Sequence, residues 1–377
     1  MTVASAPLTF RKTAETYALH PFNPLKLLAH SDRIRAMLDG ERVFPVSVEL
    51  DLSLICNHAC AWCSFDEFRA KNPISLPTAR VLTLIDELVE CGVKSVTLTG
   101  GGEPLVHKSA VEIMRKLTSS GLSWGLVTNG SRLDGERADA VAAGATFCRV
   151  SLDAGLALTH QAIHKTPGGT GDGVRQFDAI LANIKRLRSL SETLTIGASF
   201  CVFDCNIREI LTAARLVKER GGNYLEVRPV YPTAWRGGRQ DDAGISDENI
   251  DAAKMEISIA RKALQDDTFQ IIGMIDRFDA VRAFRHRDYY DRCRISALST
   301  VISSDGEIYT CCVHRGLPQF KSGNVLQQPF REAWLGQQRR DVEDSIDIDK
   351  CPKCRYVGLN ATIQGAFVHN GLHADFI

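Results

Sequence analysis

Short apolar runs alternate with amphipathic stretches along most of this chain. The apolar runs cover residues 46–52, 95–98, 124–128, 147–152, 194–202 and 224–227. Each has the length of a buried strand, whereas residues 79–91 and 177–190 repeat their apolar positions with a helical period. Strands that alternate with helices form parallel sheets with right-handed crossovers. The pattern therefore predicts an α/β fold in which six strand–helix units close partway into an incomplete (β/α)6 barrel.

Other patterns flank the predicted barrel. Residues 27–38 are amphipathic enough for a helix that leads into the barrel, and 251–264 also show a helical period after a glycine-rich, acidic stretch at 237–251. Two short runs flank Asp305-Gly306, which favours a β-hairpin. The predicted parts are a lead-in segment (1–44), the barrel (45–235), a helical linker (236–285), a small module with a hairpin and a helix (286–360), and a tail (361–377).

Composition limits where the protein works and what it binds. The 377 residues are 44% hydrophobic, enough for two or three domains with a large core. The formal net charge is zero, so no nucleic-acid or membrane-surface partner is expected. No apolar stretch is long enough to span a bilayer and no signal peptide begins the chain, which predicts a cytoplasmic protein. Its twelve cysteines are then better explained as metal ligands than as disulfides.

Three of these cysteines, Cys56, Cys60 and Cys63, are spaced C-x3-C-x2-C. Thiolates select iron–sulfur clusters or zinc. A four-iron cluster held by only three thiolates leaves one iron without a protein ligand, and a small molecule can bind there. Zinc is the alternative, because His58 lies within the same loop. Zinc would leave the glycine-rich segment that follows unexplained.

That segment, Leu-Thr-Gly-Gly-Gly-Glu-Pro at 98–104, comes directly after the second predicted strand. Glycines let a backbone approach a ligand closely, and a carboxylate accepts hydrogen bonds from an ammonium group. Together with the cysteine spacing and the aromatic residue before the third cysteine, the segment resembles the radical S-adenosylmethionine (radical SAM) superfamily. The resemblance implies a six-unit partial barrel, a [4Fe-4S] cluster on the three cysteines, and SAM chelated to the open iron. The residues that it assigns to SAM are Trp62, beside the adenine, and Gly100, Gly101, Gly102 and Glu103, near the amino group.

Polar residues also follow three later strands. Asn129 follows the third strand, Ser151 and Asp153 the fourth, and Arg228 the sixth. Ligands of α/β folds gather at the carboxyl ends of strands. The resemblance makes Asn129, Ser151 and Asp153 candidate contacts of the ribose or methionine part of SAM, although Asn-Gly and Asp-Ala are also ordinary turn formers. Arg228 can pair with a carboxylate of a ligand, or with Glu226 or another acid of the protein.

A second group of cysteines lies near the C-terminus. Cys293 precedes the predicted hairpin, Cys311 and Cys312 end it, and Cys351 and Cys354 form a C-x2-C pair. This arrangement resembles the twitch module, a shortened relative of the SPASM extension of radical SAM enzymes. The resemblance implies one auxiliary [4Fe-4S] cluster held by Cys293, Cys311, Cys351 and Cys354. Cys312 is the alternative to Cys311, and a structural zinc is the alternative to the cluster.

The resemblance also implies a type of reaction. Electron transfer into SAM yields a 5′-deoxyadenosyl radical, which removes a hydrogen atom from carbon. An auxiliary cluster with four cysteine ligands can accept an electron from the substrate radical, which favours dehydrogenation of a small polar metabolite such as a sugar, an aminocyclitol or a nucleoside. If a spare thiol such as Cys312 donates a hydrogen atom instead, the product is an epimer. The expected partners are this small-molecule substrate and an electron donor of the flavodoxin or ferredoxin type.

Dehydrogenation needs a base, and three basic residues follow the fourth predicted strand. The catalytic candidates are His164 and Lys165, together with the nearby His160. The alternative is that all three are solvated loop residues without a catalytic role. His369 and His373 share one face of a possible helix, but no third ligand accompanies them, so we expect an ordinary tail.

Two other functions remain open from the sequence. The first is a peptide-modifying enzyme, because related modules serve peptide maturation. It would gain support if residues 1–44 contained a winged helix and strands, although that segment looks short and poor in strands. The second is a zinc-bound interaction protein without catalytic activity.

Overall fold

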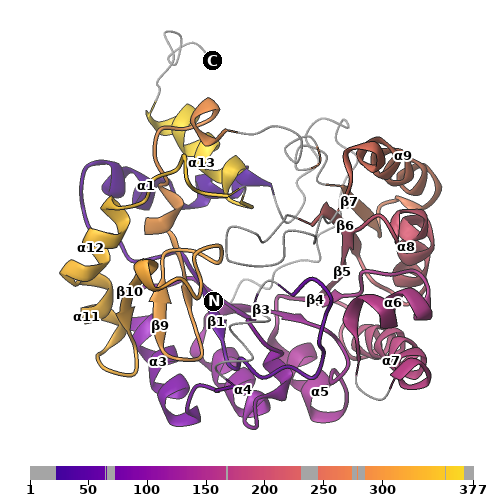
Figure 1. The fold of residues 1–377 in the computed structure, drawn as a ribbon. Coiled ribbons are helices and arrows are strands. Elements are labelled where there is room, and N and C mark those ends of the chain that lie inside the picture. The colour runs from indigo at the N-terminus through magenta and orange to yellow at the C-terminus, as the bar shows by residue number, and fades with distance from the viewer. Residues whose placement is uncertain are drawn as a thin grey trace.

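One sheet of ten strands organises the molecule (Figure 1). The computed structural model describes residues 23–63, 65, 73–166, 169–230, 245–273, 278, 285–352 and 354–368. The strands are β1 (Ser47–Asp51), β2 (Ser95–Thr99), β3 (Ser123–Thr128), β4 (Phe147–Ser151), β5 (Thr195–Val202), β6 (Tyr224–Pro229), β7 (Gln270–Gly273), β8 (Ser299–Ile302), β9 (Glu307–Tyr309) and β10 (Lys321–Asn324). They lie in the order β10-β9-β8-β1-β2-β3-β4-β5-β6-β7, so within the described residues the sheet does not close into a full barrel.

Strands β1 to β7 are parallel and follow one another in chain order. The six strands predicted from the sequence are all present, and the partial barrel is confirmed. In β1, Val48 and Leu50 belong to the main hydrophobic core, so Glu49 and Asp51 lie on the opposite face. This face carries charged residues on several strands, and it is the inner face of the curved sheet.

Helices pack along the outer face of the sheet (Figure 1). They are α3 (Thr78–Glu90), α4 (Ala110–Ser120), α5 (Gly135–Gly144), α6 (Ala157–His164), α7 (Gly169–Leu190), α8 (Ile210–Glu219) and α9 (Asp247–Leu264), with short 3-10 turns η2 (Pro104–Val106) and η3 (Ile207–Glu209) between them. In α3 the buried residues are Val81, Leu84, Ile85 and Leu88, the i, i+3, i+4, i+7 spacing of an apolar stripe. That stripe fixes which side of the helix meets the sheet.

A seventh parallel strand lies where the sequence predicted only a helical linker. Strand β7 pairs with β6, and Leu225 lies opposite Ile271. The strand has four residues, Gln-Ile-Ile-Gly, which is too short for a pattern of alternation to be recognised. The predicted end of the barrel at residue 235 therefore precedes a further strand of the same sheet.

The C-terminal hairpin extends the barrel sheet instead of standing apart from it. Strands β8 and β9 are antiparallel and joined through Gly306, whose φ of 80° favours glycine, which confirms the predicted hairpin. Strand β8 also pairs in parallel with β1, with Ser299 opposite Ser47. The first and eighth strands thus lie side by side, although more than half of the chain separates them.

Both ends of the described chain pack together on this module. Residues 27–38, predicted as one helix, are divided between the 3-10 helix η1 (Pro24–His30) and α1 (Ser31–Leu38). A second hydrophobic cluster joins them to the C-terminal module through Leu27, Ile34, Ile295, Leu298, Tyr356 and Ile363. The remaining elements are η5 (His286–Asp288), η6 (Ile295–Ala297), η7 (Pro318–Phe320), α11 (Phe330–Leu335), α12 (Gln337–Asp344), α13 (Val357–Ile363) and the π-helical turn η8 (Gln364–Val368). Residues 369 and 373 lie outside the described residues.

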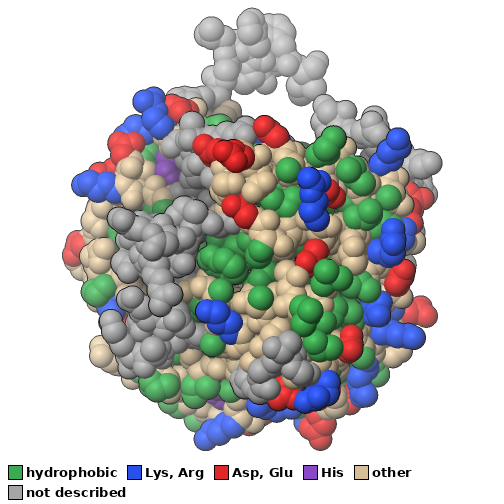
Figure 2. All heavy atoms as spheres, turned by 45° about the vertical axis from the view of Figure 1, so that its right-hand side comes forward, with side chains coloured by type: hydrophobic (Ala, Val, Ile, Leu, Met, Phe, Trp, Pro, Cys, Tyr) green, Lys and Arg blue, Asp and Glu red, His purple; other side chains and the backbone are tan. Residues whose placement is uncertain are grey.

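The surface gives little indication of a large charged partner. On the face in Figure 2, Lys and Arg side chains alternate with Asp and Glu side chains, as expected from equal numbers of each sign. Among the described residues, no helix is both long enough and apolar enough to cross a bilayer.

Candidate active site

The first cysteine loop lies between β1 and α3, at the carboxyl end of the barrel strands. Cys56, Cys60 and Cys63 are all half-buried thiols without a disulfide. Backbone hydrogen bonds from Ala59 N to His164 O (3.2 Å) and from Ala61 N to Ile163 O (2.8 Å) attach the loop to the end of α6. The backbone N–H of His58 also points at the Cys56 sulfur, 3.4 Å away. Three accessible thiols on an anchored loop fit a cluster that has one iron left open.

The glycine segment packs directly against the start of this loop. A Cβ on Gly102 would lie 2.3 Å from the carbonyl oxygen of Ile55, and one on Gly101 would lie 2.6 Å from Leu54. Hydrogen bonds from Gly102 N to Ser53 O (3.1 Å) and from Glu103 N to Ile55 O (2.9 Å) join the two segments. The sequence predicted that these glycines let the backbone approach a ligand. In the structure two of them are required by the chain itself, while the SAM contact of the segment stays a prediction.

Glu103 is fully engaged by the protein. Its side chain is 2% exposed and accepts hydrogen bonds from Leu105 N (3.0 Å), Thr128 Oγ1 (2.7 Å) and Asn129 N (2.8 Å). Burial raises the pKa of this carboxyl, while the hydrogen bonds oppose that shift. The carboxylate therefore braces the ends of β2 and β3, a role that the sequence analysis missed.

Asn129 holds the cysteine loop. Its side-chain amide donates to Asn57 Oδ1 (2.9 Å), and its own oxygen accepts from the backbone and hydroxyl of Ser131. Asn57 in turn donates to Ser131 Oγ (2.8 Å). The predicted SAM contact of Asn129 thus competes with a structural network that fixes the residue after Cys56.

Two other predicted cofactor contacts differ in their surroundings. Ser151 ends β4 opposite Ser199, and no hydrogen bond of its hydroxyl is found among the described residues. Arg228 on β6 lies opposite Cys201 on β5. The Nε of Arg228 is buried without a hydrogen-bond partner in the described part of the chain. Glu226, its expected alternative partner, pairs with Arg149 at 2.7 Å. The contacts of Ser151 and Arg228 with SAM stay predictions.

Trp62 stacks on Phe203, with ring centroids 3.9 Å apart and planes at 27°. Phe203 follows β5, so this pair closes the loop against the far wall of the partial barrel. The contact of Trp62 with the adenine of SAM stays a prediction.

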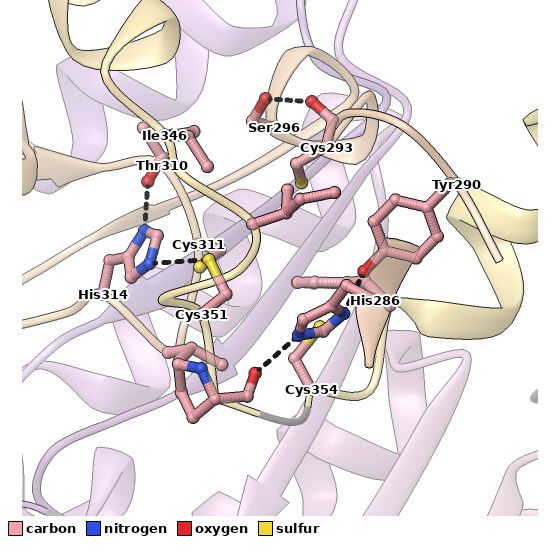
Figure 3. A pocket seen from close by; sticks show the side chains of 14 residues that line it. His286, Tyr290, Cys293, Ser296, Thr310, Cys311, His314, Ile346, Cys351 and Cys354 are labelled. Carbon is pink, nitrogen blue, oxygen red and sulfur yellow. Dashed lines mark hydrogen bonds between the residues drawn. The ribbon is translucent and has the colours of Figure 1, made fainter. Parts of the chain in front are cut away.

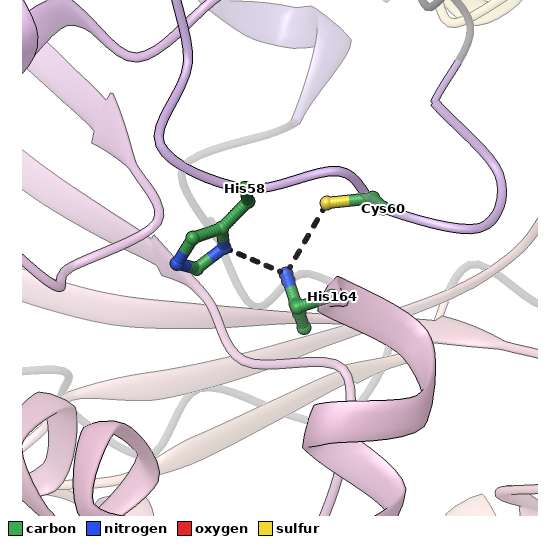
Figure 4. A group of neighbouring side chains, drawn as sticks. All are labelled: His58, Cys60 and His164. Atoms are coloured by element: carbon green, nitrogen blue, oxygen red, sulfur yellow. Dashed lines mark hydrogen bonds between the residues drawn. The ribbon is translucent and has the colours of Figure 1, made fainter. Parts of the chain in front are cut away.

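His164 lies buried beside the cysteine loop, and its role as a catalytic base stays a prediction. It is 3% exposed, and its Nδ1 lies 3.5 Å from Cys60 Sγ and 3.4 Å from His58 Nδ1 (Figure 4). Its Nε2 lies 3.3 Å from Asp153 Oδ2. Burial lowers the pKa of His164, but Asp153 and Cys60 outweigh burial and raise it to about 10. The geometry joins His164 to the cysteine loop instead of to an open cavity.

The two neighbouring basic residues also differ from the sequence-based hypothesis. His160 is 0% exposed, stacks on His164 at 4.3 Å, and has its pKa lowered to about 2 by burial and by the neighbouring histidines. Lys165 is exposed and caps α6 in the left-handed conformation, with φ at 45°. A periodic amphipathic pattern cannot distinguish such cap and core positions from a barrel mouth.

A second centre lies in the C-terminal module. Four sulfurs, those of Cys293, Cys311, Cys351 and Cys354, line one cavity (Figure 3). Its other walls are mostly apolar and include Ile346, Ile348 and Val313. Cys312 does not line it, so the geometry favours Cys311 over Cys312 as the fourth ligand. The four thiols fit the auxiliary cluster.

Hydrogen-bond donors surround these sulfurs. Asn360 Nδ2 lies 3.7 Å from Cys293 Sγ, and His314 Nε2 lies 3.7 Å from Cys351 Sγ. Burial and the neighbouring Cys293 raise the pKa of the Cys351 thiol to about 12. Thiols crowded in an apolar cavity become thiolates only when a cation is present, and a bound cluster supplies that charge.

Two acids of β1 hold the module to the barrel. Buried Arg315 places Nε 3.0 Å from Asp51 Oδ2 and Nη2 3.2 Å from Glu49 Oε2, and Arg355 also pairs with Glu49. Burial raises the pKa of Asp51 to about 7, against the opposing charge of Arg315. The sequence analysis missed this network. Its only signal was a pair of acids at alternate positions of an otherwise apolar strand.

Comparison with known families decides what these two centres are. The model of the radical SAM superfamily matches residues 51–217, and that of the SPASM iron–sulfur cluster-binding domain matches residues 293–355. The chain carries a radical SAM domain followed by a SPASM domain. It is a radical SAM enzyme with a C-terminal SPASM module. Its cofactors are SAM and a [4Fe-4S] cluster, and the module binds auxiliary iron–sulfur.

Several proteins with different names are similar in sequence to this radical SAM enzyme. The chain is 28% identical to the AdoMet-dependent heme synthase of Methanosarcina barkeri, over 83% of this chain and 89% of that protein. It is 24% identical to the mycofactocin maturase MftC of Mycobacterium tuberculosis (88% and 81%) and 26% identical to the PqqA peptide cyclase of Ruegeria pomeroyi (77% and 74%).

The fold has a close counterpart among solved structures. Streptococcus suis SuiB bound to its precursor peptide SuiA superimposes with a TM-score of 0.63 at 15% identity, over 89% of this chain and 75% of SuiB. At that identity the likeness concerns the fold alone.

Proposed function

We propose that this radical SAM enzyme modifies a peptide substrate. The observation that carries the proposal is the likeness to the PqqA peptide cyclase over 77% of the chain, accompanied by likeness to the maturase MftC. The sequence alone favoured a small polar metabolite and kept the peptide as the alternative. The relatives support the alternative better, because neither of these two is named for oxidation of a sugar or an aminocyclitol.

The proposal gives each group of residues one role. Cys56, Cys60 and Cys63 would hold the first cluster, and Cys293, Cys311, Cys351 and Cys354 the auxiliary one. When bound, the first cluster with SAM supplies a 5′-deoxyadenosyl radical, and the auxiliary cluster supplies an electron acceptor. SAM is expected to bind among Gly100 to Gly102, the ring of Trp62 and the hydroxyl of Ser151.

Arg228 is the residue of the barrel best suited to recognise a carboxylate. Its guanidinium lies at the carboxyl end of β6, beside Cys201, and its Nε has no hydrogen-bond partner among the described residues. A guanidinium can bind a carboxylate through two parallel hydrogen bonds. In this proposal Arg228 binds either the methionyl carboxylate of SAM or an acidic group of the peptide.

The described part of the N-terminal segment offers no strand for binding a peptide. Residues 23–44 contain η1 and α1 and no strand, so this stretch offers no sheet edge to a peptide. Edge strands of the main sheet are the places where an extended peptide can add a strand. Within the described residues these edges are β7 and β10.

A direct assay tests the proposal. The full chain is reconstituted anaerobically with iron and sulfide, reduced, and given SAM with peptides encoded beside its gene. The expected result is 5′-deoxyadenosine together with a mass change in one peptide, and transfer of deuterium from the labelled peptide into 5′-deoxyadenosine. A Cys56→Ala variant is the control and should yield neither. If sugars or aminocyclitols are consumed while every peptide stays unchanged, the proposal is wrong.

A tetrapyrrole is the second candidate substrate. It is favoured by the 28% identity to the AdoMet-dependent heme synthase over 89% of that protein. Porphyrin propionates carry carboxylates, which Arg228 can also bind. The same assay with an iron porphyrin separates the two candidates, because a mass change in the porphyrin would support this one.

A further inference from the structure

We propose that His164, held by Asp153, is a positioning residue that hydrogen-bonds the Cys60 sulfur and raises the reduction potential of the cluster on this loop. The proposal assigns a new role to a residue that the sequence marked as a catalytic base. It rests on cluster binding by Cys56, Cys60 and Cys63, but not on the identity of the substrate.

The main chain fixes His164 against the cysteine loop. The two backbone hydrogen bonds that bracket Cys60, from Ala59 N to His164 O and from Ala61 N to Ile163 O, leave the loop no freedom to slide along α6. The ring is buried, and its Nδ1 lies 3.5 Å from the sulfur (Figure 4). That distance suits an N–H···S hydrogen bond, since sulfur acceptors are larger than oxygen.

Asp153 orients the ring from its other side. Its Oδ2 lies 3.3 Å from His164 Nε2, its Oδ1 accepts from Cys201 N (2.8 Å), and its carbonyl oxygen accepts from Asn206 Nδ2 (2.8 Å). Asp153 has a φ of 55°, which L-residues rarely adopt and which these contacts maintain. A carboxylate behind a histidine that faces a metal site fixes the orientation of the ring, as in other metalloproteins.

The effect on the cluster follows from its charge. Reduction adds an electron that resides partly on the sulfur ligands, so a hydrogen bond to Cys60 stabilises the reduced form more than the oxidised form. Loss of the donor should move the potential to more negative values. A tenfold fall in the ratio of reduced to oxidised cluster at a fixed reductant potential corresponds to about 59 mV for one electron.

A mononuclear metal is the competing use of the same atoms. One ligand atom each from His58, Cys60 and His164 lies within 4.8 Å of the others, a spacing that suits a metal ion. Such an ion would take Cys60 away from the three-cysteine set. We favour the hydrogen bond because the radical SAM family model covers this loop, and the metal becomes an outcome of the test.

The experiment compares three variants of the reconstituted full chain without any peptide. His164→Phe keeps an aromatic ring but no donor, His164→Gln restores a donor, and Asp153→Asn removes the orienting charge while tolerating the positive φ. His160→Phe is the matched control, since His160 is a buried histidine of the same helix and no contact between its ring and Cys60 is found. The midpoint potential is measured by EPR on the cluster whose signal changes when SAM is added, and iron and zinc are counted.

The expected result is a negative shift in His164→Phe that lowers the reduced fraction about tenfold, a smaller negative shift in Asp153→Asn, recovery in His164→Gln, and no shift in His160→Phe. A wild-type potential in His164→Phe with full iron content overturns the proposal. If His164→Phe does not bind iron, Asp153→Asn provides the test. An unchanged midpoint potential in Asp153→Asn then overturns the proposal. One zinc per wild-type chain that disappears in His164→Phe also overturns it. Failure of every peptide assay leaves these outcomes unaffected.

Discussion

Arg315 of the C-terminal module points its Nε at Asp51 on β1, 3.0 Å from the carboxylate oxygen. Both side chains are buried, and Arg315 also lies 3.2 Å from Glu49. This contact makes the module part of the wall of the barrel instead of an appendage. It also places a charged network directly below the glycine segment, because a Cβ on Gly100 would lie 3.5 Å from Asp51 Oδ1.

Removing Arg315 should destabilise the protein strongly. Arg315→Met leaves the buried carboxylate of Asp51 without its partner, while Glu49 keeps only Arg355, and breaking a buried pair in this way costs about 3–5 kcal/mol. We expect that loss in the free energy of unfolding, measured by anaerobic denaturant titration. Lys350→Met is the control, because its pair with Asp347 is exposed and worth about 0–1 kcal/mol. Equal effects of the two substitutions would contradict the structural role of Arg315.

Asp51 should make stability depend on pH. Because its folded-state pKa is raised to about 7, the folded protein holds a proton that the unfolded chain has lost, and stability falls as pH rises through 7. Between pH 6 and pH 8 the contribution is about 1 kcal/mol. Asp51→Asn should remove this pH dependence. The free energy of unfolding of the variant, relative to wild type, should therefore be higher at pH 8 than at pH 6. Denaturation at the two pH values checks this, and a parallel response of both proteins would refute it.

The two cysteine groups should separate cleavage of SAM from turnover. Cys56→Ala should abolish formation of 5′-deoxyadenosine, since it removes a predicted ligand of the first cluster. Cys351→Ala should still form some 5′-deoxyadenosine and yet fail to give product, because the electron acceptor is lost. Chromatography of the quenched reaction measures both species. Normal product formation by Cys351→Ala would disprove the electron-acceptor role.

Cys311 and Cys312 should behave differently despite being neighbours. Cys311 lines the four-sulfur cavity and Cys312 does not, so Cys311→Ser should lose about four irons per chain while Cys312→Ser keeps them. Iron and sulfide counting after reconstitution distinguishes the variants. The reverse result would assign the auxiliary ligand to Cys312.

Asn360 should tune the auxiliary cluster. Its Oδ1 accepts from Arg294 N (2.8 Å) and Ile295 N (3.1 Å), which leaves its Nδ2 to donate toward Cys293 Sγ. Asn360→Leu should therefore shift the auxiliary potential to more negative values and cost about 1–3 kcal/mol through the unpaired backbone donors. Thr362→Ala is the control on the same helix, since Thr362 is half-buried and its hydroxyl bonds only Gly358 O among the described residues. A shift of equal size in both variants would count against a specific hydrogen bond.

Patterns repeated over several residues allowed much of this fold to be predicted. The six strands, the hairpin around Gly306 and both cysteine groups depend on local periodicity or short spacing. Strand β7 was missed because four residues show no period. The pairing of β8 with β1 was missed because no local signal describes a contact between residues 47 and 299.

The site was harder to predict because side-chain direction depends on tertiary packing. His164 follows a strand end, as a catalytic residue would, yet α6 turns it inward against Cys60. Glu103 has the right chemistry to bind an ammonium group, yet its carboxylate already accepts hydrogen bonds from three donors of the protein. Cys311 and Cys312 are equivalent in spacing, and only the cavity distinguishes them.

Pairing of Ser47 with Ser299 has a consequence for synthesis of the chain. On the ribosome, β1 emerges early but acquires its β8 neighbour only after some 250 further residues have been made, and such distant pairings form slowly. Until then one side of β1 stays open to pairing with other chains. A product that stops before the C-terminal hairpin should therefore aggregate even though its barrel strands are all present.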